Sequence, residues 1–165
     1  MAHLAQVNLA RLRFPAGSPR VREFVAAVDR INRLADQAPG FIWRYGPGEG
    51  HLNQADATGD PLMIINLSVW RSYEHLHAYV YRSAHGAFVR RRYEWFERIQ
   101  APATALWWVA DGDEPTPAEA LVRLAHLRAY GPTPQAFTVR SRFTPEGRRE
   151  KAPGPSRITR GGESR

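Results

Sequence analysis

The sequence contains no cysteine. Disulfide bonds, thiolate nucleophiles and cysteine-ligated zinc or iron–sulfur centres are therefore excluded. No stretch approaches the roughly 18 consecutive apolar residues that a membrane-spanning helix needs. The first residues, MAHLAQVNLARLRF, also lack the long apolar segment of a secretory signal. From these absences we expect a cytoplasmic protein with no membrane partner.

Basic charge is concentrated at the end of the chain. The formal net charge is +7, and residues 140–165 account for +5 of it, with eight basic and three acidic side chains. The segment is rich in Pro, Gly, Ser and Arg and has few apolar residues to bury, which is typical of disorder. We therefore expect a disordered basic tail over 144–165 and no specific nucleic-acid partner.

Four segments have the composition and alternation typical of β-strands: 3–12, 41–45, 61–70 and 104–110. Between the first two, Ser18 and Pro19 are a good helix start, and that helix stops at Pro39. Between the last two, helical spacing begins at Ser72, breaks near Ser83 and continues to Ile99.

The order strand, helix, strand, strand, helix, strand predicts an α+β fold with a ferredoxin-like βαββαβ core and an antiparallel sheet. A capping box at Thr116 opens one more helix, which ends at Gly131, and 137–143 reads as a short edge strand. We predict a single domain over 1–143.

The predicted sheet has two unlike faces. One face is apolar: Val7, Leu9, Met63, Ile65, Leu67 and Val69. The other mixes polar and large apolar groups: Gln6, Asn8, Ile64, Asn66, Ser68 and Trp70. We expect the apolar face to lie against the helices. Buried asparagines are costly without hydrogen-bond partners, so the mixed face is predicted to line a ligand cavity or to be covered by a second subunit.

The segment NLSVWRSYEHLHAYVYRSAHGAFVRRRYEWFERI, residues 66–99, resembles the central part of an uncharacterised bacterial family, domain of unknown function 3291. LAQVNLARLR, PGFIWR, ALWWVADGDEPTPAEALVRL and GPTPQAFTVR fit the same family, so the resemblance covers nearly all of 3–143. The family is in turn similar to antibiotic-biosynthesis monooxygenases. That resemblance implies a dimeric α+β barrel, in which two sheets pack face to face, and a pocket between each sheet and its helices.

The heme-degrading relatives of those enzymes use an Asn on the first strand, an aromatic residue on the helix after the third strand and a His further along. Asn8 and Tyr79 fall at similar places in this chain. The aromatic residue here is Tyr rather than Trp, and His85 follows it by six residues, where the heme enzymes place their ligand about one turn later. We therefore predict no cofactor and keep heme as an alternative.

Three residues are candidates for catalysis. His85 lies at a helix junction beside Gly86, where an imidazole can act as a general acid or base or can simply bridge the break. Asn8 and Asn66, on the mixed face, can stabilise an oxyanion or can bond to each other or to water.

Further residues are candidates for substrate binding. Arg44 can clamp a carboxylate or phenolate, with a surface salt bridge as the alternative. Arg92 shares a helix side with Phe88 and Phe96, unlike its neighbours in the Arg90–Arg92 run. An aromatic set can wall a pocket or be ordinary core: Trp70, Tyr79, Trp95 and Phe96. No spacing of histidines suits a metal, so no metal site is predicted.

These residues leave four functions open. The first is a monooxygenase-like enzyme that acts on an apolar or aromatic substrate, with His85 as acid or base. The second is a non-oxidative isomerase, lyase or cyclase that uses the same pocket. The third is a protein that carries heme or a hydrophobic ligand without turnover. The fourth is a structural or regulatory homodimer.

Overall fold

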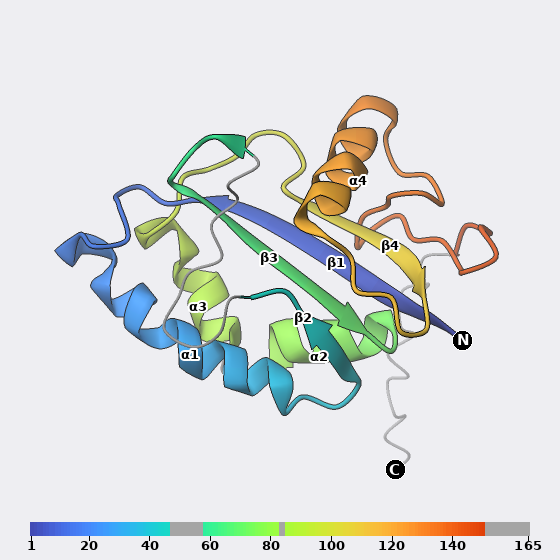
Figure 1. Ribbon diagram of the computed structural model, residues 1–165, viewed down its shortest axis with the longest axis horizontal. Coiled ribbons are helices and arrows are strands. Elements are labelled where there is room, and N and C mark those ends of the chain that lie inside the picture. Colours follow the sequence, from blue (N-terminus) through green and yellow to red (C-terminus); the bar gives the residue numbers. More distant parts are fainter. Residues whose placement is uncertain (47–57, 83–84, 151–165) are drawn as a thin grey trace, which may run out of the picture.

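An antiparallel four-stranded sheet forms the centre of the molecule (Figure 1). The computed structural model describes residues 1–46, 58–82 and 85–150, apart from the side chains of Arg82 and His85. The elements, in chain order, are β1 (Ala2–Arg11), the 3-10 turn η1 (Pro19–Val21), α1 (Arg22–Asp36), β2 (Phe41–Arg44), β3 (Met63–Trp70), α2 (Tyr73–Arg82), α3 (His85–Arg91), the 3-10 turn η3 (Arg92–Glu94), β4 (Thr104–Ala110) and α4 (Pro117–Tyr130).

The strands lie in the order β2-β3-β1-β4, and every neighbouring pair is antiparallel. Helix α1 connects β1 to β2, and α2 and α3 connect β3 to β4. Each connection crosses over one intervening strand, which is the ferredoxin-like arrangement. The predicted α+β class and antiparallel sheet are confirmed, and the topology is compatible with the predicted ferredoxin-like core.

Local sequence signals account for the helix ends. The Ser18 hydroxyl accepts a hydrogen bond from the Arg20 amide at 3.3 Å, and Pro19 begins η1, which leads into α1. The Thr116 hydroxyl accepts a hydrogen bond from the Glu119 amide at 3.2 Å and opens α4. Each cap satisfies a backbone N–H group that has no partner within the helix.

Helices cover both faces of the sheet, and this corrects the predicted arrangement. The apolar face packs against α4, whose Ala120, Leu124 and Leu127 are buried on it. The mixed face lies beneath α1, α2 and α3, on the other side of the sheet (Figure 1). The expectation that the apolar face meets these three helices assumed that helices cover only one face, whereas α4 covers the apolar face and leaves the mixed face to the other three.

The helix predicted to reach Ile99 ends earlier than expected. Helix α3 ends at Arg91, and the 3-10 turn η3 follows it. Beyond it the backbone pairs with the end of β1, because Trp95 C=O accepts a hydrogen bond from the Arg13 amide and the Glu97 amide donates to Arg11 C=O, both at 2.9 Å. These backbone hydrogen bonds to β1 take the place of the hydrogen bonds that would have continued the helix.

The short strand predicted over 137–143 is reduced to one bridge. Phe137 exchanges both backbone hydrogen bonds with Leu106 of β4, at 2.8 and 2.9 Å, and the pairing goes no further among the described residues. The chain then stays hydrogen-bonded past 143, since the Glu150 amide donates to Arg142 C=O and their side chains form a 2.7 Å ion pair. Residues 151–165 of the predicted tail lie outside the described residues.

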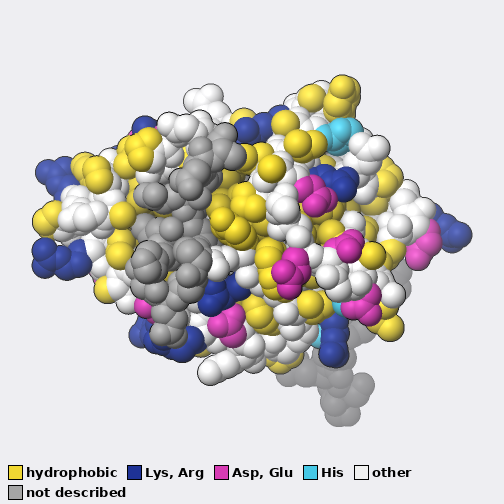
Figure 2. All heavy atoms as spheres, viewed as in Figure 1, with side chains coloured by type: hydrophobic (Ala, Val, Ile, Leu, Met, Phe, Trp, Pro, Cys, Tyr) yellow, Lys and Arg dark blue, Asp and Glu magenta, His cyan; other side chains and the backbone are white. Residues whose placement is uncertain are grey.

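On the face seen in Figure 2, hydrophobic side chains gather near the middle, and basic side chains lie in separate groups both at the margin and nearer the middle. In the part of the chain that the structure describes, no helix has both the length and the apolar character to span a membrane.

Gly40 is expected to be indispensable for the turn from α1 to β2. Its φ is +77°, and a Cβ there would clash with the His75 ring, so Gly40→Ala combines left-handed strain with overpacking. We expect a loss of about 2–4 kcal/mol in the free energy of unfolding, measured by urea denaturation. Gly112→Ala is the matched control, because Gly112 has φ +84° with nothing within 4 Å of the added Cβ. Equal losses for both variants would contradict this account.

Candidate functional site

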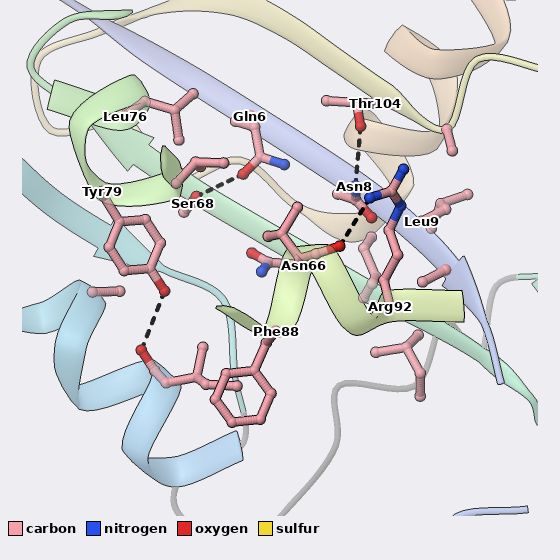
Figure 3. Close-up of a pocket in the computed structure, with 18 of the residues that line it drawn as sticks. Gln6, Asn8, Leu9, Asn66, Ser68, Leu76, Tyr79, Phe88, Arg92 and Thr104 are labelled. Atoms are coloured by element: carbon pink, nitrogen blue, oxygen red, sulfur yellow. Dashed lines mark hydrogen bonds between the residues drawn. The ribbon is translucent and has the colours of Figure 1, made fainter. Parts of the chain in front are cut away.

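A cavity of about 650 Å³ lies between the mixed face of the sheet and the three helices above it (Figure 3). Its floor includes Ile64, Trp70 and Leu106 and carries polar groups from three strands: Gln6 and Asn8 of β1, Asn66 and Ser68 of β3, and Thr104 of β4. Its roof is mostly apolar: Phe24, Val28, Ile31, Leu76, Tyr79, Val80, Phe88 and Val89. The cavity therefore separates a row of neutral polar groups from an apolar cover.

Strand register brings the polar floor together. Asn8 lies opposite Asn66, and Gln6 lies opposite Ser68. Most of the floor is internally bonded: the Asn8 amide donates to the Thr104 hydroxyl at 3.0 Å, and the Ser68 hydroxyl donates to the Gln6 carbonyl at 3.1 Å (Figure 3). Sequence reasoning placed Gln6 and Ser68 on this face without assigning them to the site, and it missed Thr104, which only the register of β4 places beside Asn8.

Asn66 differs from its neighbours on the floor. It is exposed although β3 is an inner strand, whereas Ile64 and Ser68, two residues away on the same face, are only 9% and 5% exposed. Its side chain makes no hydrogen bond to any other residue that the structure describes. Both N–H donors and the carbonyl acceptor of this amide are therefore available to a molecule in the cavity.

An aromatic wall closes the end of the cavity near α2. The Trp70 ring stacks on Tyr79, with 5.1 Å between centroids and 26° between planes, and meets Phe41 edge-on at 5.3 Å. The Trp70 indole N–H donates to the Ser68 hydroxyl at 3.0 Å. The Tyr79 hydroxyl donates to the Ile31 carbonyl at 3.2 Å, and burial raises the pKa of this phenol well above its ordinary value. Tyr79 is therefore a neutral wall residue.

A second aromatic group lies at the α3 end. Trp95 is buried, with its ring centroid 5.8 Å from Phe24 and 5.9 Å from Phe88. Phe96 meets Phe24 edge-on at 4.8 Å. Since Phe24 belongs to α1, these contacts join α1 to the segment after α3 and support the roof of the cavity.

The two candidate arginines, Arg44 and Arg92, differ in whether an acidic side chain pairs with them. Arg44 lines the cavity, but its guanidinium binds the Asp36 carboxylate through two hydrogen bonds of 2.8 and 3.3 Å, which is the salt bridge given as the alternative to substrate binding. Arg92 also lines the cavity and has no carboxylate partner among the described residues.

Next to the cavity, Arg91 ties α1 to η3. Its guanidinium donates to Glu23 at 2.6 Å and to Glu94 at 2.7 Å. These hydrogen bonds hold the pKa of both carboxyl groups below the usual range. Arg91 is therefore a structural cation, and the Arg90–Arg92 run divides between different roles.

His85 begins α3, and its side chain lies outside the described residues. The structure thus leaves its predicted acid–base role untested. A histidine that sequence reasoning did not assign to the site, His77, lines the cavity between the rings of Tyr73 and Tyr81, at 5.6 and 4.7 Å. Within 1–46, 58–82 and 85–150, no group of three or more His, Asp or Glu side chains is placed to hold a metal ion.

All predicted site residues with described side chains line this one cavity: Asn8, Arg44, Asn66, Trp70, Tyr79, Arg92, Trp95 and Phe96. Helices α1, α2 and α3 of the same chain lie over the mixed face, which lines the cavity. The second subunit stays a prediction.

The family model for the domain of unknown function DUF3291 matches residues 3–153. The chain belongs to this family. Among solved structures, it is similar to a protein of unknown function from Nitrosomonas europaea, at 11% identity and a TM-score of 0.44, over 70% of this chain and 97% of that one. The chain matches none of the curated proteins with which it was compared.

Ser68 is expected to be the structural link in the polar floor of this DUF3291 chain. Ser68→Ala leaves the buried Trp70 N–H without its acceptor, so we expect a loss of about 1–3 kcal/mol in the free energy of unfolding. Gln6→Met is the control: it removes only the acceptor of the Ser68 hydroxyl, on the cavity side, where water can replace it. Urea denaturation measures both, and a smaller loss for Ser68→Ala than for Gln6→Met would refute this role.

Proposed function

We propose that this protein is a small-molecule enzyme that binds an apolar or aromatic substrate in the cavity between the mixed sheet face and α1, α2 and α3. The main observation behind this proposal is the cavity itself, which has neutral amide and hydroxyl groups on its floor and mostly apolar side chains on its roof. A volume of about 650 Å³ lies within the ordinary range for small-molecule sites.

The free amide of Asn66 supports a reacting oxygen on the substrate. An inner strand fixes the backbone of Asn66, and its amide donors have no bond to another described residue to give up when a ligand arrives. The remaining floor groups are already bonded to one another, so they keep the site in shape. In this arrangement Asn66 is the donor that stabilises a developing oxyanion, and Asn8 supports it from the opposite strand.

The proposed chemistry follows the resemblance to antibiotic-biosynthesis monooxygenases. A deprotonated phenol supplies the electrons to molecular oxygen: one oxygen atom enters the substrate, which becomes a quinone, and the other leaves as water. The protein contributes a base and oxyanion donors in a largely apolar cavity. His85 is the proposed base, because it begins the helix that forms one side of the roof. A non-oxidative isomerase, lyase or cyclase could use the same groups, and it differs from the proposed enzyme in that it consumes no oxygen.

Heme finds less support in this cavity. Of the two residues at positions similar to those of the heme-degrading enzymes, Asn8 already donates to Thr104, and Tyr79 is stacked on Trp70 and bonded to Ile31. Either group would have to give up these contacts to meet heme.

The homodimer remains part of the proposal, with a restriction on how two chains can meet. In a dimeric α+β barrel the sheets pack face to face. Here Val7, Leu67 and Val69 on the apolar face are no more than 1% exposed within one chain, and α4 packs over them. A barrel of that kind would have to displace α4, so we propose a dimer that leaves this helix in place.

Substrate turnover tests the proposal with a series of electron-rich phenols and hydroxynaphthalenes. We expect oxygen consumption that falls about 100-fold or more in His85→Ala, while ligand binding measured by calorimetry is retained. His126→Ala is the matched control, since His126 lies on α4 and contacts Thr133 away from the cavity.

Product formation without oxygen uptake would favour the isomerase, lyase or cyclase. A Soret band that develops on titration with hemin would favour the heme-carrier alternative. Absence of binding by every compound in the series would refute the proposed function.

A further inference from the structure

Some charged side chains that line the cavity have a partner of opposite charge among the described residues, and one does not. Arg44 is paired with Asp36, and Glu97 is paired with Arg11. Arg92 lines the same cavity and has no carboxylate partner among the residues that the structure describes. The described lining therefore carries one cation whose charge no acidic group offsets.

Arg92 is held in place by contacts that leave its charge available. One terminal N–H donates to the Val89 carbonyl at 2.8 Å, another donates to the Tyr93 hydroxyl at 2.9 Å, and the guanidinium lies 4.3 Å from the centroid of the Tyr93 ring. A guanidinium has five N–H donors, so three remain for a ligand. A planar guanidinium that is already partly immobilised matches the geometry of a carboxylate, whose two oxygens can accept its hydrogen bonds.

The position of Arg92 puts the charge at one end of the polar floor. Figure 3 shows the Arg92 side chain extending from the start of η3, directly after α3, toward the sheet. Asn66, opposite Asn8 in the register, adds two free amide donors on the same floor. Since Arg92 is exposed, this end of the cavity is also the one where a charged group keeps contact with water.

The opposite end has the reverse character. Trp70, Leu76 and Tyr79 are all at most 9% exposed, and they form an apolar surface beside Ile31 of α1. The one polar atom of the Tyr79 ring is already bonded to the Ile31 carbonyl. A charged group placed there would lose its hydration without gaining a partner, so a bound amphipathic molecule has a single favourable orientation.

We propose that the substrate is an amphipathic acid: an aromatic or apolar body that lies toward Trp70 and Tyr79, and a carboxylate that binds Arg92 and one of the two Asn66 N–H donors, which leaves the other N–H for the reacting oxygen. This inference rests on the proposed function, because it specifies the substrate class of the same cavity. It also assigns Arg92 as the residue that selects anionic over neutral ligands.

The test compares naphthoate with methyl naphthoate, two probes that share the same rings and differ in the charge. Calorimetric titration of the full chain should show naphthoate binding about fivefold to tenfold more tightly, a difference that shrinks as salt is added. Arg92→Gln should remove this preference and leave the affinity for the ester unchanged. Arg90→Gln is the matched control, because it deletes the same charge two residues earlier, near the end of α3, at an exposed position that does not line the cavity.

The outcomes separate the two proposals. Equal affinities for acid and ester in the unmodified protein, or a preference that survives Arg92→Gln, would overturn the amphipathic-acid proposal and leave the proposed function standing. A preference lost equally in Arg90→Gln would also overturn it, since the effect would then be general charge attraction. If neither probe binds, the amphipathic-acid proposal fails, and the proposed function is decided by the series of phenols and hydroxynaphthalenes. Asn66→Leu tests the amide contact independently of Arg92, because this variant should weaken binding of naphthoate more than binding of its methyl ester.

Discussion

Polar side chains in the middle of an antiparallel sheet have to find hydrogen-bond partners or remain in contact with solvent, and this requirement shapes the whole molecule. On the mixed face, Gln6, Ser68 and Trp70 satisfy one another in a chain of hydrogen bonds, and Asn8 bonds to Thr104. Asn66 has no such partner among the described residues and stays exposed. Helices packed flush against it would bury an unsatisfied amide, so the space above Asn66 remains open as a cavity.

The roof of this cavity is held away from its floor by aromatic contacts and by ion pairs. Phe24 of α1 contacts both Trp95 and Phe96, and Arg91 binds Glu23 across the same gap. At the other end, the stacked Trp70 and Tyr79 rings fill the space between β3 and α2. Meanwhile α4 buries the apolar face by itself. One chain thus supplies both a conventional core and, on the other side of the sheet, a partly polar chamber.

Much of the fold could be predicted from the sequence because its signals are local. Alternation along β3 and the capping residues Ser18 and Thr116 depend on few residues, and the structure places elements where they indicate. The end of α3 could not be predicted, since it depends on backbone pairing with β1, a segment distant in sequence. The assignment of faces was wrong for a similar reason: which helices cover which face is a property of the connections and of the position of α4.

The site was predictable to the extent that period-two alternation identifies the residues of one face. Asn8, Asn66 and Trp70 were found in this way and do line the cavity. The contribution of Thr104 depends on strand register, and the pairing of Arg44 with Asp36 depends on how α1 approaches β2. Neither can be read from spacing alone. That Arg92 has no acidic partner among the described residues emerges only when those residues are placed in space.

The most direct test of this account is a crystal structure of the protein grown with naphthoate. The account predicts electron density for the ligand between β3 and α1, with its rings against Trp70 and Tyr79 and its carboxylate within hydrogen-bond distance of Asn66. A structure in which α1, α2 and α3 close onto the sheet, with Asn66 bonded to another side chain and no space for a ligand, would contradict it.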